Sequence, residues 1–299
     1  MDIWLKKLLW PGHWIKAARS SAKKNRSRSQ ADPQLLLYDR ILQTDFLHYG
    51  YFDDPDIAAD EISLADIKKA QRRYAELIIA QMTAPPEPEV LDVGCGMGGL
   101  LSMIAKKGYR VTGLTPDRNQ IDYIREKYKE IPLIHARFQD ISPEEHEDKY
   151  GTVIFSESLQ YIDLPTAMCY TDKILSERGE LIIVDYFRLD EAHEQSGHIW
   201  QEFMAETEKR GFVIRYKQDI TANIRPTLAF AHHFCTNIGL PLYEFIKLKL
   251  DHKHPGKYYF IRELFEKWDK KIDSNIKTID PEYFCRQKRY YLLKLTREV

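Results

Sequence analysis

The sequence predicts an α/β fold in which a seven-stranded, mostly parallel sheet carries helices on both faces. From Glu89 onward, short apolar segments alternate with helical ones, a pattern typical of a parallel sheet covered on both sides. A glycine-rich turn follows the first of these segments. The composition, 43% hydrophobic and 30% charged, is that of a globular chain.

The stretch before the sheet predicts helical structure over residues 34–85. Between residues 63 and 82 the apolar side chains recur near one helical face. Ser63, followed by Asp66, has the spacing of a helix start cap. The proline-rich APPEPE that follows ends this helix.

The alternating part of the chain gives each expected element a range. Strands are expected at 89–93, 109–114, 132–136, 151–156, 180–187, 211–220 and 289–296. Helices are expected at 98–107, 117–129, 164–175 and 198–210.

About 65 residues separate the last two expected strands, which is too long for a plain loop. Within them, residues 260–272 have apolar residues at helical spacing. We predict a helical insertion that folds over the ligand end of the sheet, since open α/β sheets bind ligands at the carboxyl ends of their strands. The expected units are a basic arm and linker at 1–33, a helical segment closing over the ligand at 34–85 and the main α/β domain at 86–222. They are followed by a helical cap over the substrate site at 223–286 and the last strand at 287–299.

The first 29 residues combine Trp4, Trp10 and Trp14 with eight lysines and arginines against one acid. This composition suits contact with a membrane surface; a poorly ordered or domain-packed arm is the alternative interpretation. The chain has no run of 18 apolar residues, so no membrane-spanning helix is expected. We expect a cytoplasmic protein, with peripheral contact at the inner membrane surface through this arm as the alternative, and leave the oligomeric state open.

Charge and cysteine usage exclude several classes of function. The net charge of -1 gives no global electrostatic basis for binding nucleic acid. The four cysteines contain no CxxC pair and the ten histidines no HExxH spacing, so we expect reduced thiols and no metal.

The string VLDVGCGMGG places Gly94, Gly96 and Gly98 between a strand and a helix, where a ligand can approach the backbone closely. Such a turn would equally suit a nicotinamide dinucleotide, and Asp117 lies near the distance expected for a ribose-binding acid. Asp92 favours another ligand, because a carboxylate here would repel a pyrophosphate but tolerate the ammonium and sulfonium charges of S-adenosylmethionine. Capping of loop amides is the alternative role of Asp92.

VLDVGCGMGG followed by VTGLTPDRNQ resembles the class I S-adenosylmethionine-dependent methyltransferases. The likeness is to the branch of cyclopropane fatty acid synthases and of mycolic acid, tocopherol and sterol methyltransferases, and it covers residues 46–190 well. It implies a Rossmann-like fold, S-adenosylmethionine as cofactor, and Gly94, Gly96 and Gly98 as the cofactor turn. Thr115 stands where most class I enzymes have a ribose-binding acid, and the resemblance implies that Gln120 holds the ribose instead; an exposed helix residue is the alternative.

The resemblance implies further cofactor contacts. Phe138 and Gln139 match the pair that flanks the adenine, and Ser156 ends the fourth strand. The segment DFLHYGYF resembles a tyrosine-rich segment that folds over the cofactor, with Tyr49 at the methionine end and Tyr51 at the transfer channel. Ordinary core packing is the alternative for Phe138, Tyr49 and Tyr51.

The sequence departs from the cyclopropane synthases at their bicarbonate site. The tyrosine-rich segment lacks their cysteine, and Gln160 stands where they have a glutamate. Simple methyl transfer is therefore expected. Candidate bases are Glu157, Tyr161, Asp185 and His232, whose alternative roles are hydrogen bonding to the cofactor or loop for Glu157 and helix packing for His232.

The acceptor is expected to be a small, partly hydrophobic molecule: lipid-like, prenylated or a natural product. The aromatic content of 12% and the apolar insertion favour an enclosed site. The absence of a DPPY or NPPY tetrapeptide after the fourth strand argues against methylation of flipped bases. Two alternatives stay open, a dinucleotide-dependent oxidoreductase and a non-catalytic cofactor-binding scaffold.

Overall fold

The computed structural model describes residues 35–83, 89–189 and 196–298. The expected arm and linker at 1–33 lie outside the described residues. The sheet follows the order β3-β2-β1-β4-β5-β8-β7, and β6 pairs with β5 off this path. The strands are β1 Glu89–Val93, β2 Val111–Leu114, β3 Leu133–Ile134, β4 Tyr150–Ser156, β5 Leu175–Arg188, β6 His198–Ile199, β7 Phe212–Asp219 and β8 Lys288–Arg297.

The strand pairing confirms the predicted mixed but mostly parallel sheet. β1, β2, β3, β4 and β5 pair in parallel with their neighbours, while β8 runs antiparallel to both β5 and β7. The short β6 is an eighth strand beyond the seven predicted, joined to β5 at Phe187 and Arg188. Because β1 lies between β2 and β4, the strand order reverses there and leaves a crevice at the carboxyl ends of these strands.

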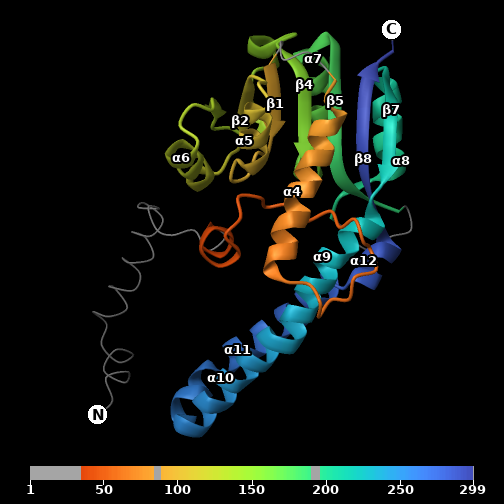
Figure 1. Cartoon of the computed structure of the whole chain (residues 1–299). Coiled ribbons are helices and arrows are strands. Elements are labelled where there is room, and N and C mark those ends of the chain that lie inside the picture. Colours follow the sequence, from red (N-terminus) through yellow and green to blue (C-terminus); the bar gives the residue numbers. More distant parts are fainter. Residues whose placement is uncertain (1–34, 84–88, 190–195, 299) are drawn as a thin grey trace.

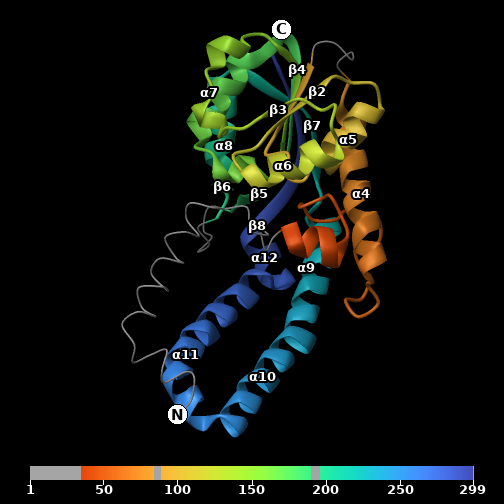
Figure 2. The same cartoon turned by 90° about the vertical axis from the view of Figure 1, so that its left-hand side faces the viewer.

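Helices cover both faces of the sheet (Figure 2). Those on one face are α4 Leu64–Gln81, α5 Gly99–Lys106, α9 Thr221–Phe234 and α12 Pro281–Gln287; those on the other are α7 Leu164–Ile174 and α8 Trp200–Lys209. α6 Arg118–Lys127 lies near the β2–β3 edge. Short helical turns are η1 Leu36–Leu42, η2 Phe138–Asp140, η3 Pro143–His146 and η4 Leu159–Tyr161. Burial of the apolar stripe of each helix on the sheet supplies the main stabilisation.

The helix α4 begins where the sequence predicts. The Ser63 hydroxyl accepts from the Asp66 N–H, and the Asp66 carboxylate accepts from the Ser63 N–H. This reciprocal cap satisfies two backbone donors that a helix start leaves without partners. The buried face of α4, which includes Tyr74 and Ile78, packs on the sheet.

The insertion before β8 is helical, as predicted, but its direction differs from the expectation. After α9 come η5 Cys235–Gly239, α10 Leu240–Lys253, α11 Pro255–Thr278 and α12. Only α9 and α12 lie against the end of the sheet, whereas α10 and α11 form a hairpin that projects away from it (Figure 1). The reason is that α10 and α11 pack on each other: the Tyr243 ring lies 6.0 Å from Phe265, and Lys247 pairs with Asp269 at 2.6 Å.

Candidate cofactor and active site

The turn between β1 and α5 adopts a backbone that only glycine accommodates easily. Gly94, Gly96 and Gly98 have φ values of +79°, +55° and +83°, in the left-handed region. A Cβ at Gly94 would lie 2.5 Å from the Cβ of Ser158. Glycine is therefore required at this turn both by the backbone conformation and by the close packing.

The residues just before Tyr49 lie directly on this turn. A Cβ at Gly96 would lie 3.2 Å from Leu47, and one at Gly99 would lie 2.7 Å from Phe46. Asp45 fixes this segment, because its carboxylate accepts from the hydroxyls of Tyr123 and Tyr128 at 2.6 Å each. The non-helical stretch between η1 and α4 thus covers the glycine turn, whereas the sequence predicts mostly helical structure over residues 34–85.

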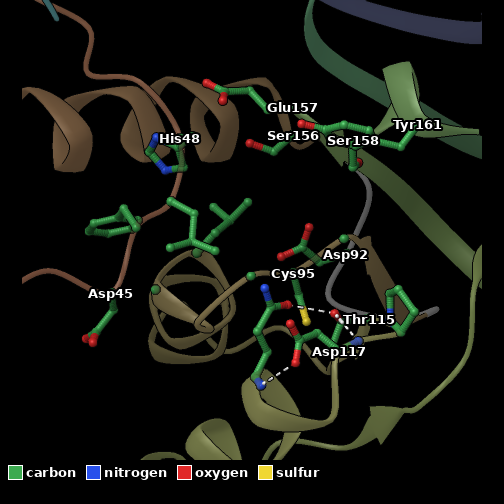
Figure 3. Close-up of a pocket in the computed structure, with 18 residues that line it drawn as sticks. Asp45, His48, Asp92, Cys95, Thr115, Asp117, Ser156, Glu157, Ser158 and Tyr161 are labelled. Carbon is green, nitrogen blue, oxygen red and sulfur yellow. Dashed lines mark hydrogen bonds between the residues drawn. The ribbon is translucent and has the colours of Figure 1, made fainter. Parts of the chain in front are cut away.

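A cavity of about 350 Å³ lies between this segment and the carboxyl ends of β1, β2 and β4. Figure 3 shows the side chains that line it. They are Asp45, Phe46, Leu47, His48, Asp92, Gly94, Cys95, Gly96, Gly99, Leu100, Thr115, Pro116, Asp117, Gln120, Ser156, Glu157, Ser158 and Tyr161. Six of the sequence-predicted cofactor residues are brought together here, with the predicted base Glu157 beside them: Asp92, Gly94, Gly96, Thr115, Gln120 and Ser156.

Besides the Ser156 hydroxyl, two buried side chains that line this cavity have acceptor atoms without a hydrogen-bond partner within the described part of the chain. Both carboxylate oxygens of Asp92 and the Nε2 of His48 are in this state. The His48 Nδ1 lies 2.7 Å from the Tyr49 carbonyl, which can only accept, so Nδ1 carries the proton and Nε2 is the acceptor. Burial lowers the pKa of His48 to about 4 and raises the pKa of Asp92 to about 7.

These two acceptors determine which ligand group fits between them. A cationic hydrogen-bond donor such as an ammonium supplies the kind of proton that these acceptors lack, and beside Asp92 it would favour the ionised form of that carboxyl. A pyrophosphate offers only acceptors, so it would leave both groups unpaired. The residues present therefore fit the methionine end of S-adenosylmethionine.

The opposite end of the cavity is polar. The Thr115 hydroxyl donates to Gln120 Oε1 at 2.7 Å, leaving the Gln120 amide N–H groups for a ligand hydroxyl. The Asp117 carboxylate accepts from the N–H groups of Asn119 and Gln120 and so caps α6. That engagement weakens the case for Asp117 as the ribose acid of a dinucleotide site.

A second cavity of about 330 Å³ adjoins the first and shares Gly94, Pro116, Ser158 and Tyr161 with it. Phe138 and Gln139 line this second cavity, as expected for an adenine site. Phe138 is also part of the core, since its ring meets Phe155 edge-on at 5.3 Å. Phe138 therefore takes part in core packing, and its contact with an adenine stays a prediction.

Glu157 has a strained backbone and a defined set of partners. Its φ is +54°, which is unusual for a residue with a side chain. Its Oε1 accepts from the Tyr290 hydroxyl at 2.6 Å and from the Tyr49 N–H at 2.8 Å, and Tyr290 in turn contacts the Tyr74 hydroxyl at 2.9 Å. Burial raises the pKa of Glu157 to about 8, although the two hydrogen bonds lower it.

The other expected bases lie in different settings. Tyr161 lines both cavities from the rim, with 78% of its surface exposed. Asp185 is buried, and burial raises its pKa to about 7, but it lines none of the cavities described above. His232 lies in the last turn of α9, where its carbonyl accepts from Thr236, and it too is outside these cavities.

The structure does not bring Tyr49, Tyr51 or Gly98 into the cavity walls. The Tyr49 ring meets Tyr290 edge-on at 6.1 Å, and Gly98 packs toward α6. Sequence reasoning selected the right segment but missed Asp45, Phe46, Leu47 and His48, which are part of the same DFLHYGYF string.

Tyr49 and Tyr51 lie outside the cavity walls because the chain around Gly50 is held elsewhere. The Gly50 N–H donates to Thr227 of α9 at 3.0 Å, and a Cβ at Gly50 would lie 2.6 Å from Ala70 of α4. The chain after His48 is thus held between α4 and α9. Within residues 35–83, 89–189 and 196–298, no group of three or more His, Cys, Asp or Glu side chains is arranged to hold a metal ion.

Comparisons with known proteins agree with this geometry. A family model described as a methyltransferase domain matches residues 67–215. A methyltransferase of Streptomyces halstedii is 28% identical over 152 residues, which are 49% of this chain and 52% of that protein. The 2-methyl-6-phytyl-1,4-hydroquinone methyltransferase of Synechocystis is 40% identical over 79 residues, 26% of this chain and 24% of that protein. The chain thus spans about half or less of the length of these relatives.

Solved structures share the fold at low identity. Geranyl diphosphate C-methyltransferase from Streptomyces coelicolor superposes with a TM-score of 0.66 at 17% identity, over 90% of this chain and 94% of that one. A cyclopropane synthase from Mycobacterium tuberculosis superposes with a TM-score of 0.61 at 16% identity, over 89% and 94%. Residues 67–215 therefore form a methyltransferase domain, its fold is that of the solved methyltransferase structures, and S-adenosylmethionine is its cofactor.

Proposed function

We propose that this protein transfers a methyl group from S-adenosylmethionine to a small, partly hydrophobic acceptor. The observation that carries the proposal is the pair of buried acceptors without partners, Asp92 and His48, facing one cavity beside the glycine turn. The pyrophosphate that a dinucleotide would place beside this turn offers no donor to either group, and the Asp117 carboxylate already caps a helix. The oxidoreductase alternative therefore has no support in the site.

When bound, S-adenosylmethionine would supply a methyl group on a positively charged sulfur; attack by the acceptor at the methyl carbon would break the carbon–sulfur bond in line and leave S-adenosylhomocysteine. The chain's own residues then have to position the partners and exclude water. Phe46 and Leu47 cover the glycine turn. Glu157 follows β4 directly and lines the same cavity, which supports its assignment as the base that takes a proton from the acceptor.

Ligand binding tests the cofactor assignment. We expect S-adenosylhomocysteine to raise the melting temperature of the protein and NAD to leave it unchanged. Stabilisation by NAD alone would overturn the proposal. Binding of S-adenosylhomocysteine without transfer of a labelled methyl group to any acceptor tried, together with no effect of Glu157 variants, would favour a non-catalytic scaffold.

Replacing Glu157 with glutamine should lower the rate of methyl transfer about a hundredfold or more if Glu157 is the base. The amide oxygen can still accept from Tyr49 and Tyr290, so S-adenosylhomocysteine affinity should change little. In the unaltered protein the rate should rise with pH through about 8, where Glu157 loses its proton. Steady-state rates at several pH values check this expectation.

The variant Tyr290→Phe is the matched control for the pH profile. The Tyr290 hydroxyl stabilises the Glu157 carboxylate, so removing it should raise the pKa of Glu157. The rise of the rate with pH should then move to higher pH. A merely structural role of Tyr290 would lower the rate without moving the profile. An unchanged rate in Glu157→Gln would remove Glu157 from the mechanism.

Replacing His48 with phenylalanine should weaken S-adenosylhomocysteine binding about tenfold. A phenyl ring keeps the stacking on Tyr74, where the centroids lie 4.1 Å apart, but it loses the Nε2 acceptor. The control is His146→Phe, since His146 stacks on Tyr150 away from the cavity. Calorimetric titration measures both; equal affinities in the two variants would contradict a role for Nε2.

The acceptor class rests on relatives and on the site. The Synechocystis relative is named for a phytyl hydroquinone, and the Streptomyces coelicolor structure for geranyl diphosphate. Gln160 and the absence of a cysteine in residues 45–52 speak for methyl transfer rather than ring closure. A panel of prenylated quinols, fatty acyl lipids and polyketides, assayed with labelled methyl donor, tests this class. Labelling of nucleic acid alone would contradict it.

We also propose how the segments of the chain divide the work. The segment 34–85 covers the cofactor, and 223–286 borders the acceptor side through α9, which bonds to Gly50. The arm at 1–33 would provide peripheral membrane contact through its tryptophans and basic residues. Among the described residues, no helix is both long and apolar enough to span a bilayer.

A further inference from the structure

The α10–α11 hairpin has a small interior of its own. The rings of Tyr243 and Tyr258 lie 6.0 Å and 5.7 Å from the buried Phe265, and Lys247 pairs with Asp269 at 2.6 Å. The hairpin projects from the end of the sheet at which the glycine turn lies (Figures 1 and 2). Because these interior contacts hold the two helices together, their outer faces need no sheet to cover them.

Those outer faces are unusually apolar. Tyr259 and Phe260, near the turn of the hairpin, are 75% and 72% exposed, and Phe245 is 58% exposed. We call the exposed large apolar residues of this region the hairpin surface: Ile238, Leu242, Phe245, Ile246, Leu248, Tyr259, Phe260, Leu264 and Trp268. Single exposed apolar residues are ordinary, but nine of them on one helical projection indicate a surface that meets another molecule.

The tip of the hairpin is also positively charged. Residues 245–262 contain five lysines and arginines but one acid, Asp251, in a chain whose net charge is -1. Lys247 and Arg262 are engaged in ion pairs with α11, whereas Lys249 and Lys253 lie exposed on α10. Aromatic residues interleaved with exposed lysines fit the headgroup boundary of an anionic bilayer.

We propose that the hairpin surface docks the protein onto an anionic lipid membrane, with the aromatic tip inserted at the headgroup level. Charge favours this occupant over a parallel pair of hairpins and over the segment 1–34. Two hairpins packed side by side in parallel would bring their basic tips together. The segment 1–34, with eight basic and two acidic residues, repels the tip in the same way.

The position of the hairpin gives this docking a consequence for the site. α9 leads into the hairpin and is bonded through Thr227 to Gly50, next to the segment that covers the cavity. A docked tip would therefore hold the cavity end of the sheet toward the lipid. The inference stands apart from the proposed methyl transfer, because it concerns a surface that shares no residue with the cavity.

Co-sedimentation of the full chain with vesicles tests the proposal. Vesicles of equal parts phosphatidylcholine and phosphatidylglycerol should bind the protein about tenfold more tightly than pure phosphatidylcholine. Salt at about 0.5 M should abolish most of that difference by screening. The full-length variants Lys249→Glu/Lys253→Glu and Tyr259→Ser/Phe260→Ser should each lower binding to the anionic vesicles about tenfold.

Matched controls separate the hairpin from general effects. The double variant Lys106→Glu/Lys107→Glu reverses two exposed lysines at the end of α5, and Met204→Ser removes an exposed apolar side chain of α8; both should bind vesicles like the unaltered protein. A variant that replaces Trp4, Trp10 and Trp14 with alanine measures how much residues 1–33 contribute to vesicle binding. S-Adenosylhomocysteine affinity should be the same in every hairpin variant, so failure of docking and failure of the cofactor site are told apart.

Three results would overturn the proposal. The first is equal binding to neutral and anionic vesicles. The second is full retention of binding in both hairpin variants, with loss only in the tryptophan variant. The third is a dimer in sedimentation velocity that Tyr259→Ser/Phe260→Ser converts to monomer without any vesicle binding, which would make a second copy the occupant.

Discussion

Replacing Gly94 with alanine is expected to cost both stability and cofactor binding. The backbone there has φ +79°, and the new Cβ would lie 2.5 Å from the Cβ of Ser158. Ser158 cannot retreat freely, because its hydroxyl donates to the Val93 carbonyl at 2.5 Å. The left-handed conformation costs about 1 kcal/mol and the contact about 2 kcal/mol more. We therefore expect the free energy of unfolding to fall by about 3 kcal/mol.

Gly108→Ala is the matched control for this prediction. Gly108 has φ +90°, yet a Cβ there would meet nothing within 4 Å. It should lose only the conformational part, about 1 kcal/mol, and keep its affinity for S-adenosylhomocysteine. Urea denaturation and calorimetric titration of the two variants compare them directly. Equal losses in both would show that the contact with Ser158 carries no weight.

Most of the sheet could be predicted from the sequence because its signals are local. Strands such as Glu89–Val93 and Tyr150–Ser156 are short segments rich in apolar residues, and helices such as α4 and α7 carry their own caps, at Ser63 and Asp163. The two-residue β6 has no periodicity to detect. Its pairing with Arg188 depends on where the chain returns, which residues 196–199 do not specify by themselves.

The direction of the insertion could not be predicted for a related reason. Helical spacing identifies an apolar face but not the surface against which that face packs. Phe265 packs inside the hairpin, whereas Phe260, five residues earlier, is exposed. Only the antiparallel pairing of α10 and α11 makes this distinction.

The residues of the candidate site also fall into those that local sequence signals predict and those that depend on how the chain packs in three dimensions. Asp92, Gly94 and Ser156 line the cavity because each ends a strand or begins a turn, and those positions can be read from the sequence. His48 could not be selected over Tyr49, because the choice depends on the run of the chain between α4 and α9. A histidine next to a tyrosine-rich segment was the available signal, but its buried Nε2 is visible only in three dimensions.

Raising the pH from 6 to 7.5 is expected to tighten S-adenosylhomocysteine binding about eightfold through Asp92. Burial raises the pKa of this carboxyl to about 7 in the ligand-free protein. Below that pH it is protonated and neutral, so it offers an ammonium no charge; above it the carboxylate is ionised and attracts one. The range stops short of pH 8 because an α-amino group itself loses its proton there.

The variant Asp92→Asn should abolish this pH dependence and weaken binding about tenfold at pH 7.5, since a charge-assisted hydrogen bond is lost. Asp185→Asn is the control, because burial raises the pKa of Asp185 to the same value of about 7 although it does not line the cavity; its affinity should still rise with pH.

The free energy of unfolding of the ligand-free protein changes with pH in the opposite direction from the ligand affinity. A raised carboxyl pKa stabilises the free protein at low pH, and this contribution is lost as pH rises through 7. Bound S-adenosylhomocysteine should therefore raise the free energy of unfolding more at pH 7.5 than at pH 6. A flat affinity profile in the unaltered protein, or a persistent slope in Asp92→Asn, would mean that another group carries the charge that this turn presents to its ligand.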